Sequence, residues 1–125
     1  MDLNSISGTI VDAAFHIHRT LGPGLLESVY EVVLAHELGR RGLKVERQKP
    51  VPIEFEGIRF EEGFRADLIV EHCVVVELKS VEELSRVHSK QLLTYLRLLD
   101  YRLGPLINFG APVIKDGIRR IVNRL

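Results

Sequence analysis

Apolar residues recur every three to four positions through the first third of the chain, which is the spacing of amphipathic helices. This repeat predicts a first helix over residues 5–21. The sequence Leu21-Gly22-Pro23-Gly24 should end that helix, because Gly and Pro both disfavour its continuation. A second helix is predicted over residues 25–41, with Gly42 as its C-terminal cap.

After Gly42 the pattern changes to alternating apolar and polar residues, which is typical of strands with one buried face. Residues 44–55 should form such a strand, and Pro50 and Pro52 indicate that it lies at a sheet edge or carries a bulge. Glu56-Gly57 then predicts a turn. The residues that follow predict a short strand over 58–62 and a hairpin with strands over 64–70 and 73–78.

The last third of the chain predicts a helix over residues 82–100, an apolar strand over 103–109 and a final strand around 117–123. This order favours an α/β (α+β) fold in which a mixed central sheet is flanked by helices. No internal repeat or linker interrupts the pattern. We therefore expect residues 1–125 to form a single domain.

Composition and charge narrow the functions available to this domain. The chain has 17 Lys and Arg against 17 Asp and Glu, so any nucleic-acid contact must come from local clusters of basic residues. The single cysteine, Cys73, excludes an intrachain disulfide. The N-terminus lacks the basic region of a signal peptide, and no apolar run approaches the roughly 20 residues of a membrane span. We expect a cytoplasmic protein with no membrane partner.

Charged residues interrupt the predicted hairpin where a sheet would normally bury apolar side chains. Asp67 lies within Phe-Arg-Ala-Asp-Leu-Ile-Val, and Glu77 and Lys79 lie within Val-Val-Val-Glu-Leu-Lys. Glu77 and Lys79 are two residues apart on one strand, so they point to the same face. Burial of such charges is unfavourable unless they are paired or bound to a metal ion. The pattern therefore indicates either a metal site or a buried ion-pair network.

The length of the hairpin loop decides whether Asp67 can join Glu77. If Val70 pairs with Cys73, Asp67 faces away from Glu77. If Val70 pairs with Val74, Asp67 falls directly opposite Glu77, where two carboxylates repel each other unless a cation lies between them. A metal site therefore requires the odd-length loop.

Two predicted helices carry further polar candidates. Glu27 and Tyr30 share one face of the second helix, and Gln91 and Tyr95 share one face of the third. With these positions included, the chain resembles the GxxExxY family, a small branch of the PD-(D/E)XK nuclease superfamily, over nearly its whole length. The usual proline before the Asp is replaced by Ala66. The matching residues are Gly24-Leu25-Leu26-Glu27-Ser28-Val29-Tyr30, Asp67, Glu77-Leu78-Lys79, Gln91-Leu92-Leu93-Thr94-Tyr95 and Leu106-Ile107-Asn108-Phe109-Gly110.

The resemblance implies a restriction-endonuclease-like core and hydrolysis of DNA or RNA phosphodiesters by water that Mg²⁺ or Mn²⁺ activates. Mg²⁺ prefers oxygen ligands and keeps several waters. Lys79 is expected to orient the attacking water or to stabilise developing charge. The expected metal ligands are Asp67, Glu77, the backbone carbonyl of Leu78, and Glu27 directly or through water. The expected substrate-positioning residues are Gln91, Tyr95 and Tyr30.

Other interpretations stay open at this point. Glu27 also fits an exposed glutamate favoured by the dipole at a helix N-terminus. A catalytically silent nuclease-fold module that binds nucleic acid or a partner protein is the alternative function. A homodimer is plausible because one small domain offers little surface to grip a duplex. Two basic groups, each more often a solvated face, would support nucleic-acid binding if they lay beside Glu27 and Asp67: Arg40, Arg41, Lys44, Arg47 and Lys49, and Lys115, Arg119, Arg120 and Arg124.

Overall fold

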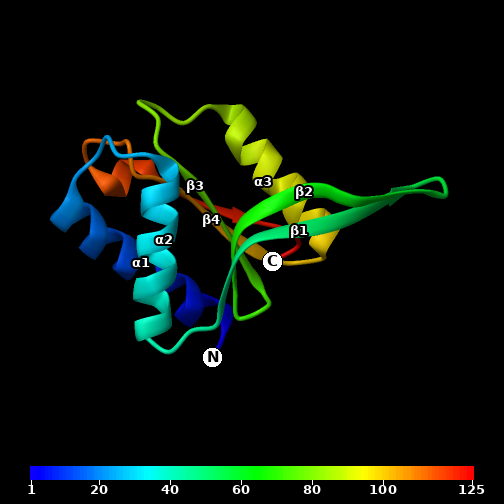
Figure 1. Cartoon of the computed structure of the whole chain (residues 1–125), viewed down its shortest axis with the longest axis horizontal. Helices are drawn as coiled ribbons and strands as arrows, with labels where there is room; N and C mark the ends of the chain where they lie inside the picture. The colour runs from blue at the N-terminus through cyan, green and yellow to red at the C-terminus, as the bar shows by residue number, and fades with distance from the viewer.

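In the computed structural model, which describes residues 1–125, a five-stranded sheet carries helices on both faces (Figure 1). No helix is long and apolar enough to cross a membrane. The helices are α1 (Leu3–Leu21), α2 (Glu27–Arg40) and α3 (Arg86–Leu99), with a short 3₁₀ helix η1 (Ile114–Gly117). The strands are β1 (Val45–Phe55), β2 (Ile58–Val70), β3 (Val74–Lys79), β4 (Leu103–Asn108) and β5 (Ile118–Val122).

The sheet is mixed, as the sequence predicts. Its strands lie in the order β1-β2-β3-β4-β5, and only the β3–β4 pair is parallel. That pair is joined through α3, because parallel neighbours need a long crossover connection. One core lies between the sheet and helices α1 and α2, and a smaller core lies beneath α3. The central strand β3 is buried throughout except at its last residue.

The long β2 strand corrects the prediction of two separate strands over 58–62 and 64–70. Gly63 lies within β2 instead of ending a strand. A Cβ atom there would lie 2.5 Å from the Ile53 side chain, so glycine permits a close approach of β1. The β1–β2 register shifts between Val51 and Ile53, and this irregularity, together with the edge position of β1, confirms the prediction made from Pro50 and Pro52.

The third helix begins later than predicted, at Arg86 instead of Glu82. Ser85 is its N-cap in a capping box with His88, and His88 Nδ1 accepts a hydrogen bond from the Ser85 backbone N–H. The preceding segment is held by Asn108 at the end of β4. The Asn108 amide donates to the Val81 carbonyl at 2.9 Å, and its oxygen accepts from Val81 N at 3.0 Å. The capping box at Ser85 and the hydrogen bonds from Asn108 together outweigh the helical periodicity of residues 82–85.

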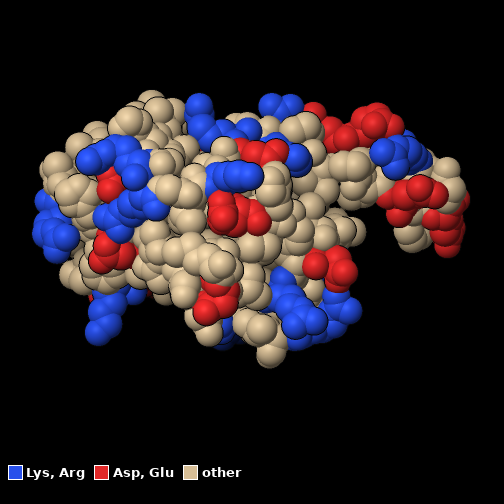
Figure 2. Space-filling model, turned by 90° about the horizontal axis from the view of Figure 1, so that it is seen from below, with Lys and Arg blue, Asp and Glu red and all other residues tan.

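The β1–β2 hairpin projects well beyond the rest of the molecule (Figure 1). Its tip exposes large apolar side chains, including Phe55 at 66% and Phe60 at 51% of their surface. Acidic residues gather on the same projection (Figure 2). Between residues 53 and 62 the hairpin has four glutamates and a single arginine, so its tip is unsuited to contact with a phosphate backbone. The acidic residues are Glu54, Glu56, Glu61 and Glu62.

Candidate active site

The β2–β3 hairpin has the odd-length loop that a metal site requires. Val70 pairs with Val74, and the antiparallel ladder ends at the Leu68–Val76 pair. Within the loop, Glu71 and His72 have positive φ angles of 53° and 55°. This register places Asp67 opposite Glu77, which confirms the geometric condition set by the sequence.

At this point the two carboxylates replace the main-chain ladder. The Asp67 backbone N–H donates to Glu77 Oε1 at 3.2 Å, and the Leu78 backbone N–H donates to Asp67 Oδ2 at 2.9 Å. Each acidic side chain therefore accepts a hydrogen bond from the opposite strand. Three apolar neighbours pack in the core beneath α1 and α2: Leu68, Val76 and Leu78.

The carboxyl pair is strongly coupled. Burial, followed by the charge of Asp67, raises the pKa of Glu77 to about 8, and the nearby Lys79 ammonium opposes this only in part. Burial also raises the pKa of Asp67, against the hydrogen bond from Leu78 N. Because the charge of Asp67 disfavours ionisation of the buried Glu77, the pKa of Glu77 lies well above that of an isolated glutamate. The two side chains together offer carboxyl oxygens from neighbouring strands, and these are the ligands that a hard divalent cation prefers.

Asp67 also faces an open pocket between the sheet and α2. The pocket has a volume of about 380 Å³ and includes Glu27, the first residue of α2. A second pocket of about 620 Å³ shares Glu27 and Ser28 with it and runs toward Gly110. No group of three or more His, Cys, Asp or Glu residues is placed to hold a metal ion. Glu27 therefore shares the pocket of Asp67 without completing a cluster. The lining of the first pocket is Glu27, Ser28, Glu31, Arg47, Gln48, Asp67 and Leu78.

Comparison with known protein families decides the assignment. The family model described as PD-(D/E)XK nuclease superfamily matches residues 4–121, nearly the whole chain. The chain belongs to the PD-(D/E)XK nuclease superfamily. No curated protein and no solved structure gives a significant match. The mixed sheet with helices on both faces agrees with the restriction-endonuclease-like fold of this superfamily, whose nucleases generally use divalent metal ions.

In this PD-(D/E)XK chain the lysine of the motif lies beside the carboxyl pair. Lys79 is the last residue of β3 and is half-buried. Its charge acts on Glu77, yet it forms no salt bridge and is absent from the lining of the pocket that contains Asp67. The Lys79 backbone carbonyl accepts a hydrogen bond from Phe109 N at 2.8 Å. The main chain of this residue is therefore fixed while its ammonium group keeps no anionic partner.

The three residues expected to position a substrate have different surroundings. Tyr95 stacks on Phe64 with ring centroids 4.0 Å apart. Burial, followed by the charges of Glu77 and Asp67, raises the pKa of the Tyr95 hydroxyl. Gln91 is exposed on α3, and its side chain forms no hydrogen bond within the protein.

Tyr30 corrects the expectation of a substrate contact, because its side chain has no exposed surface. Its ring stacks on Phe109, with centroids 4.4 Å apart. Its hydroxyl donates to the Gly22 carbonyl at 2.6 Å and accepts from Leu25 N at 3.1 Å. Tyr30 thus holds the loop that leads into α2 and positions Glu27 from beneath.

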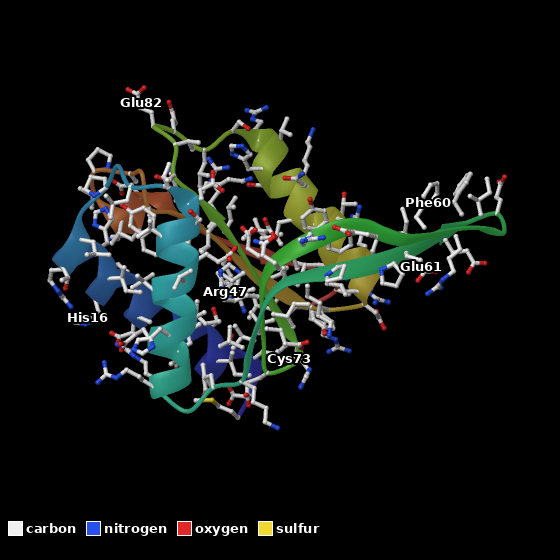
Figure 3. The ribbon with its side chains drawn as sticks, in the orientation of Figure 1. His16, Arg47, Phe60, Glu61, Cys73 and Glu82 are labelled. Carbon is white, nitrogen blue, oxygen red and sulfur yellow. The ribbon has the colours of Figure 1, made fainter.

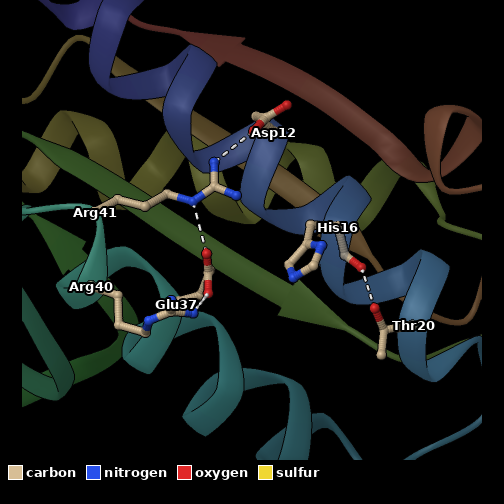
Figure 4. Close-up of polar contacts among 6 residues, drawn as sticks. All are labelled: Asp12, His16, Thr20, Glu37, Arg40 and Arg41. Atoms are coloured by element: carbon tan, nitrogen blue, oxygen red, sulfur yellow. Dashed lines mark hydrogen bonds and ion pairs between the residues drawn. The ribbon is translucent and has the colours of Figure 1, made fainter.

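Most of the predicted basic group on α2 and β1 is used within the structure. Arg41 bridges Asp12 at 2.6 Å and Glu37 at 2.9 Å, which joins α1 to α2, and Arg40 pairs with Glu37 (Figure 4). Lys49 pairs with Glu46 at 2.6 Å. In the C-terminal group, Arg119 donates to the Ser85 and Leu84 carbonyls and Arg120 to Asn4. Of the two predicted groups, only Arg47 lines the pocket beside Asp67.

Two pocket residues, Glu31 and Gln48, lacked a role in the sequence interpretation, and Arg47 was only one member of a basic group. Glu31 is buried and accepts hydrogen bonds from Arg47 and Gln48. In sequence Glu31 is only one more glutamate on a helix, and no residue pattern marks Gln48 itself as the point where the alternation of its strand breaks. Contact between β1 and α2 brings these residues together, and no local pattern encodes that contact.

Proposed function

We propose that residues 1–125 act as a single metal-dependent nuclease domain of the GxxExxY branch, which hydrolyses phosphodiesters of DNA or RNA. The carboxyl pair formed by Asp67 and Glu77 carries this proposal. Two carboxyl groups held opposite each other at the end of a β ladder, Glu77 buried and Asp67 partly buried, are unfavourable unless a cation or a reaction uses them. Membership of a nuclease superfamily supports the same conclusion.

The residues of the site would divide the work as follows. Asp67, Glu77 and the backbone carbonyl of Leu78 would hold Mg²⁺ or Mn²⁺, and Glu27 would reach the ion through water across the pocket. When bound, the cation supplies activation of the attacking water and neutralisation of phosphate charge. The Lys79 ammonium, which has no anionic partner in the protein, would stabilise negative charge as it develops on the phosphate.

Two residues of α3 would assist from the other side of the carboxyl pair. The hydroxyl of Tyr95 lies within the electrostatic influence of Glu77 and Asp67, and stacking on Phe64 fixes its ring. Exposed Gln91, one turn earlier on α3, has both amide donors available for a nucleic-acid backbone. We assign them the positioning of substrate and no part in the chemical step.

The decisive experiment measures manganese binding and cleavage on the same preparations. Wild type and Asp67→Asn are compared for the increase in melting temperature with manganese and for cleavage of single-stranded, duplex and branched DNA and of RNA. Wild type should be stabilised and active, whereas Asp67→Asn should show neither effect. Equal stabilisation of both proteins would refute the assigned metal site. Cleavage by both proteins would point to a contaminating nuclease.

A catalytically silent module that binds nucleic acid or a partner protein is the second candidate function. The absence of a cluster of three His, Cys, Asp or Glu residues favours it. It predicts that nucleic acid or a protein partner binds without cleavage and that manganese leaves the melting temperature unchanged. The same panel therefore separates the two functions.

We further propose that the protein works in the cytoplasm as a homodimer. The case for the cytoplasm is that the chain has a single cysteine, Cys73, and so contains no intrachain disulfide. The case for a dimer is the limited surface of one small domain. Analytical ultracentrifugation tests the dimer, and a monomer at all concentrations would refute it.

A further inference from the structure

Two consecutive residues of β1 point into the pocket beside Asp67. Side chains next to each other on a regular strand face opposite sides of a sheet, yet Arg47 and Gln48 both line this pocket. Gln48 has a left-handed backbone with φ of 48°. The regular pairs Arg47–Leu68 and Lys49–Ala66 flank it, so Gln48 lies opposite Asp67. The unusual φ angle is the local cause of the break in alternation.

This backbone conformation is unfavourable for a residue other than glycine, and such residues cluster at functional sites. Here it orients an amide that joins two acidic side chains. Gln48 Nε2 donates to Asp67 Oδ1 at 3.3 Å and also to Glu31 Oε1. The strained residue therefore connects α2 to the carboxyl pair and, through the same backbone turn, directs the Arg47 side chain to the pocket.

Arg47 is held at the pocket by one edge of its guanidinium group. Its Nε and Nη2 atoms donate to Glu31 Oε2 at 3.2 and 3.1 Å, and Nη1 donates to no protein atom. The Glu31 side chain is only 8% exposed, whereas that of Arg47 is 47% exposed. Figure 3 shows Arg47 between α2 and the β1–β2 hairpin. A buried carboxylate thus anchors an arginine whose remaining donors face solvent.

Charge in the pocket indicates what those donors are for. Glu27, Glu31 and Asp67 line it with three carboxylates, and Arg47 is its only cation. An anionic phosphate would be repelled there unless a metal ion and a positioned cation both met it. A guanidinium group suits that task, because its planar donors match the oxygens of a phosphate.

We propose that Arg47 is a substrate-binding residue that contacts a non-bridging oxygen of the phosphodiester, with Glu31 and Gln48 as its positioning residues. The proposal rests on the nuclease function proposed above and identifies the side chain that recognises the backbone of the nucleic acid. The contact is made to phosphate and carries no base preference, so it should affect all sequences alike.

The experiment uses binding, so it does not depend on turnover. Fluorescence anisotropy of a labelled single-stranded and a labelled duplex oligonucleotide is measured in Ca²⁺ at several salt concentrations. Removal of Arg47 alone leaves the buried Glu31 carboxylate without its main partner and could prevent folding. The comparison is therefore between Glu31→Gln and the double variant Glu31→Gln/Arg47→Ala, which differ only at residue 47. Arg65→Ala is the matched control, since Arg65 is exposed on β2 and pairs with Glu62.

We expect the double variant to bind about ten- to a hundredfold more weakly than Glu31→Gln, with a salt slope reduced by about one. Arg65→Ala should bind as wild type does. In cleavage assays the loss should raise KM more than it lowers kcat. If wild type binds and cleaves while the double variant binds nucleic acid as tightly as wild type does, the role of Arg47 is overturned and the nuclease function stands. If wild type neither binds nor cleaves nucleic acid, both proposals fail together.

Discussion

Replacement of Glu77 by glutamine should change how stability depends on pH. The unfolded chain ionises Glu77 near pH 4.5, whereas the folded protein holds the proton to about pH 8. Between these values the native state binds a proton that the unfolded chain has released. The free energy of unfolding therefore falls as pH rises, by about 1.4 kcal/mol per pH unit and by on the order of 5 kcal/mol over the window.

Glutamine is nearly isosteric with protonated glutamic acid. Its oxygen can accept from Asp67 N and its amide can donate to the Asp67 carboxylate, but it does not ionise. In the metal-free protein, Glu77→Gln should therefore match wild type near pH 5 and become more stable than wild type as pH approaches 8.5. Manganese should reverse that order at high pH, because only the ionised wild-type carboxylate can bind it.

The assay is urea unfolding in EDTA at a series of pH values from 5 to 8.5, repeated with manganese. Glu61→Gln, at the exposed hairpin tip, removes the same formal charge and is the matched control. It should keep the wild-type pH dependence. The reasoning is refuted if the wild-type free energy of unfolding does not fall over this range, or if Glu77→Gln falls as steeply as wild type.

Three further substitutions, one of them with Gly8→Ala as its control, test other parts of the structure. Lys79→Ala should lower the cleavage rate about a hundredfold or more while manganese binding measured by calorimetry is largely kept; unchanged cleavage would remove Lys79 from the chemistry. Gly110→Ala should destabilise the protein by about 1–3 kcal/mol in urea unfolding, because a Cβ atom there would lie 2.3 Å from the Val81 carbonyl oxygen. Its control is Gly8→Ala in α1, where a Cβ atom meets nothing within 4 Å. Gly8→Ala should stabilise the protein by about 0.5–1 kcal/mol, because alanine favours a helix over glycine. Tyr30→Phe loses two hydrogen bonds of the loop before α2 and should lower stability by about 1–3 kcal/mol with a rise in the KM for nucleic acid; equal stability would argue against its structural role.

Local patterns in the sequence were sufficient to predict most of the helices and strands and part of the site. Apolar residues repeat about every 3.6 residues in a helix and every two in a strand, because of the backbone geometry. The repeat is visible in the sequence wherever one side of the element is buried and the other stays exposed. The sequence also reduced the register of the β2–β3 hairpin to two alternatives, in which Val70 pairs with Cys73 or with Val74. Only the second, with the odd-length loop, places Asp67 opposite Glu77. The structure contains that loop, and the family match agrees with the motif that spans it.

Other features required the tertiary structure, because they depend on contacts between segments distant in sequence. Asn108, at the end of β4, holds the segment before α3, and Gly63 permits the close approach of Ile53 from β1. Tyr30 lies in the core, where its hydroxyl forms hydrogen bonds with the backbone of Gly22 and Leu25. The same reason applies to Arg47: its neighbours in sequence mark it as one of several basic surface residues, and only the packing of β1 against α2 makes it the single cation beside Asp67. Side-chain periodicity reports burial, but the partners of a polar group are set by the whole fold.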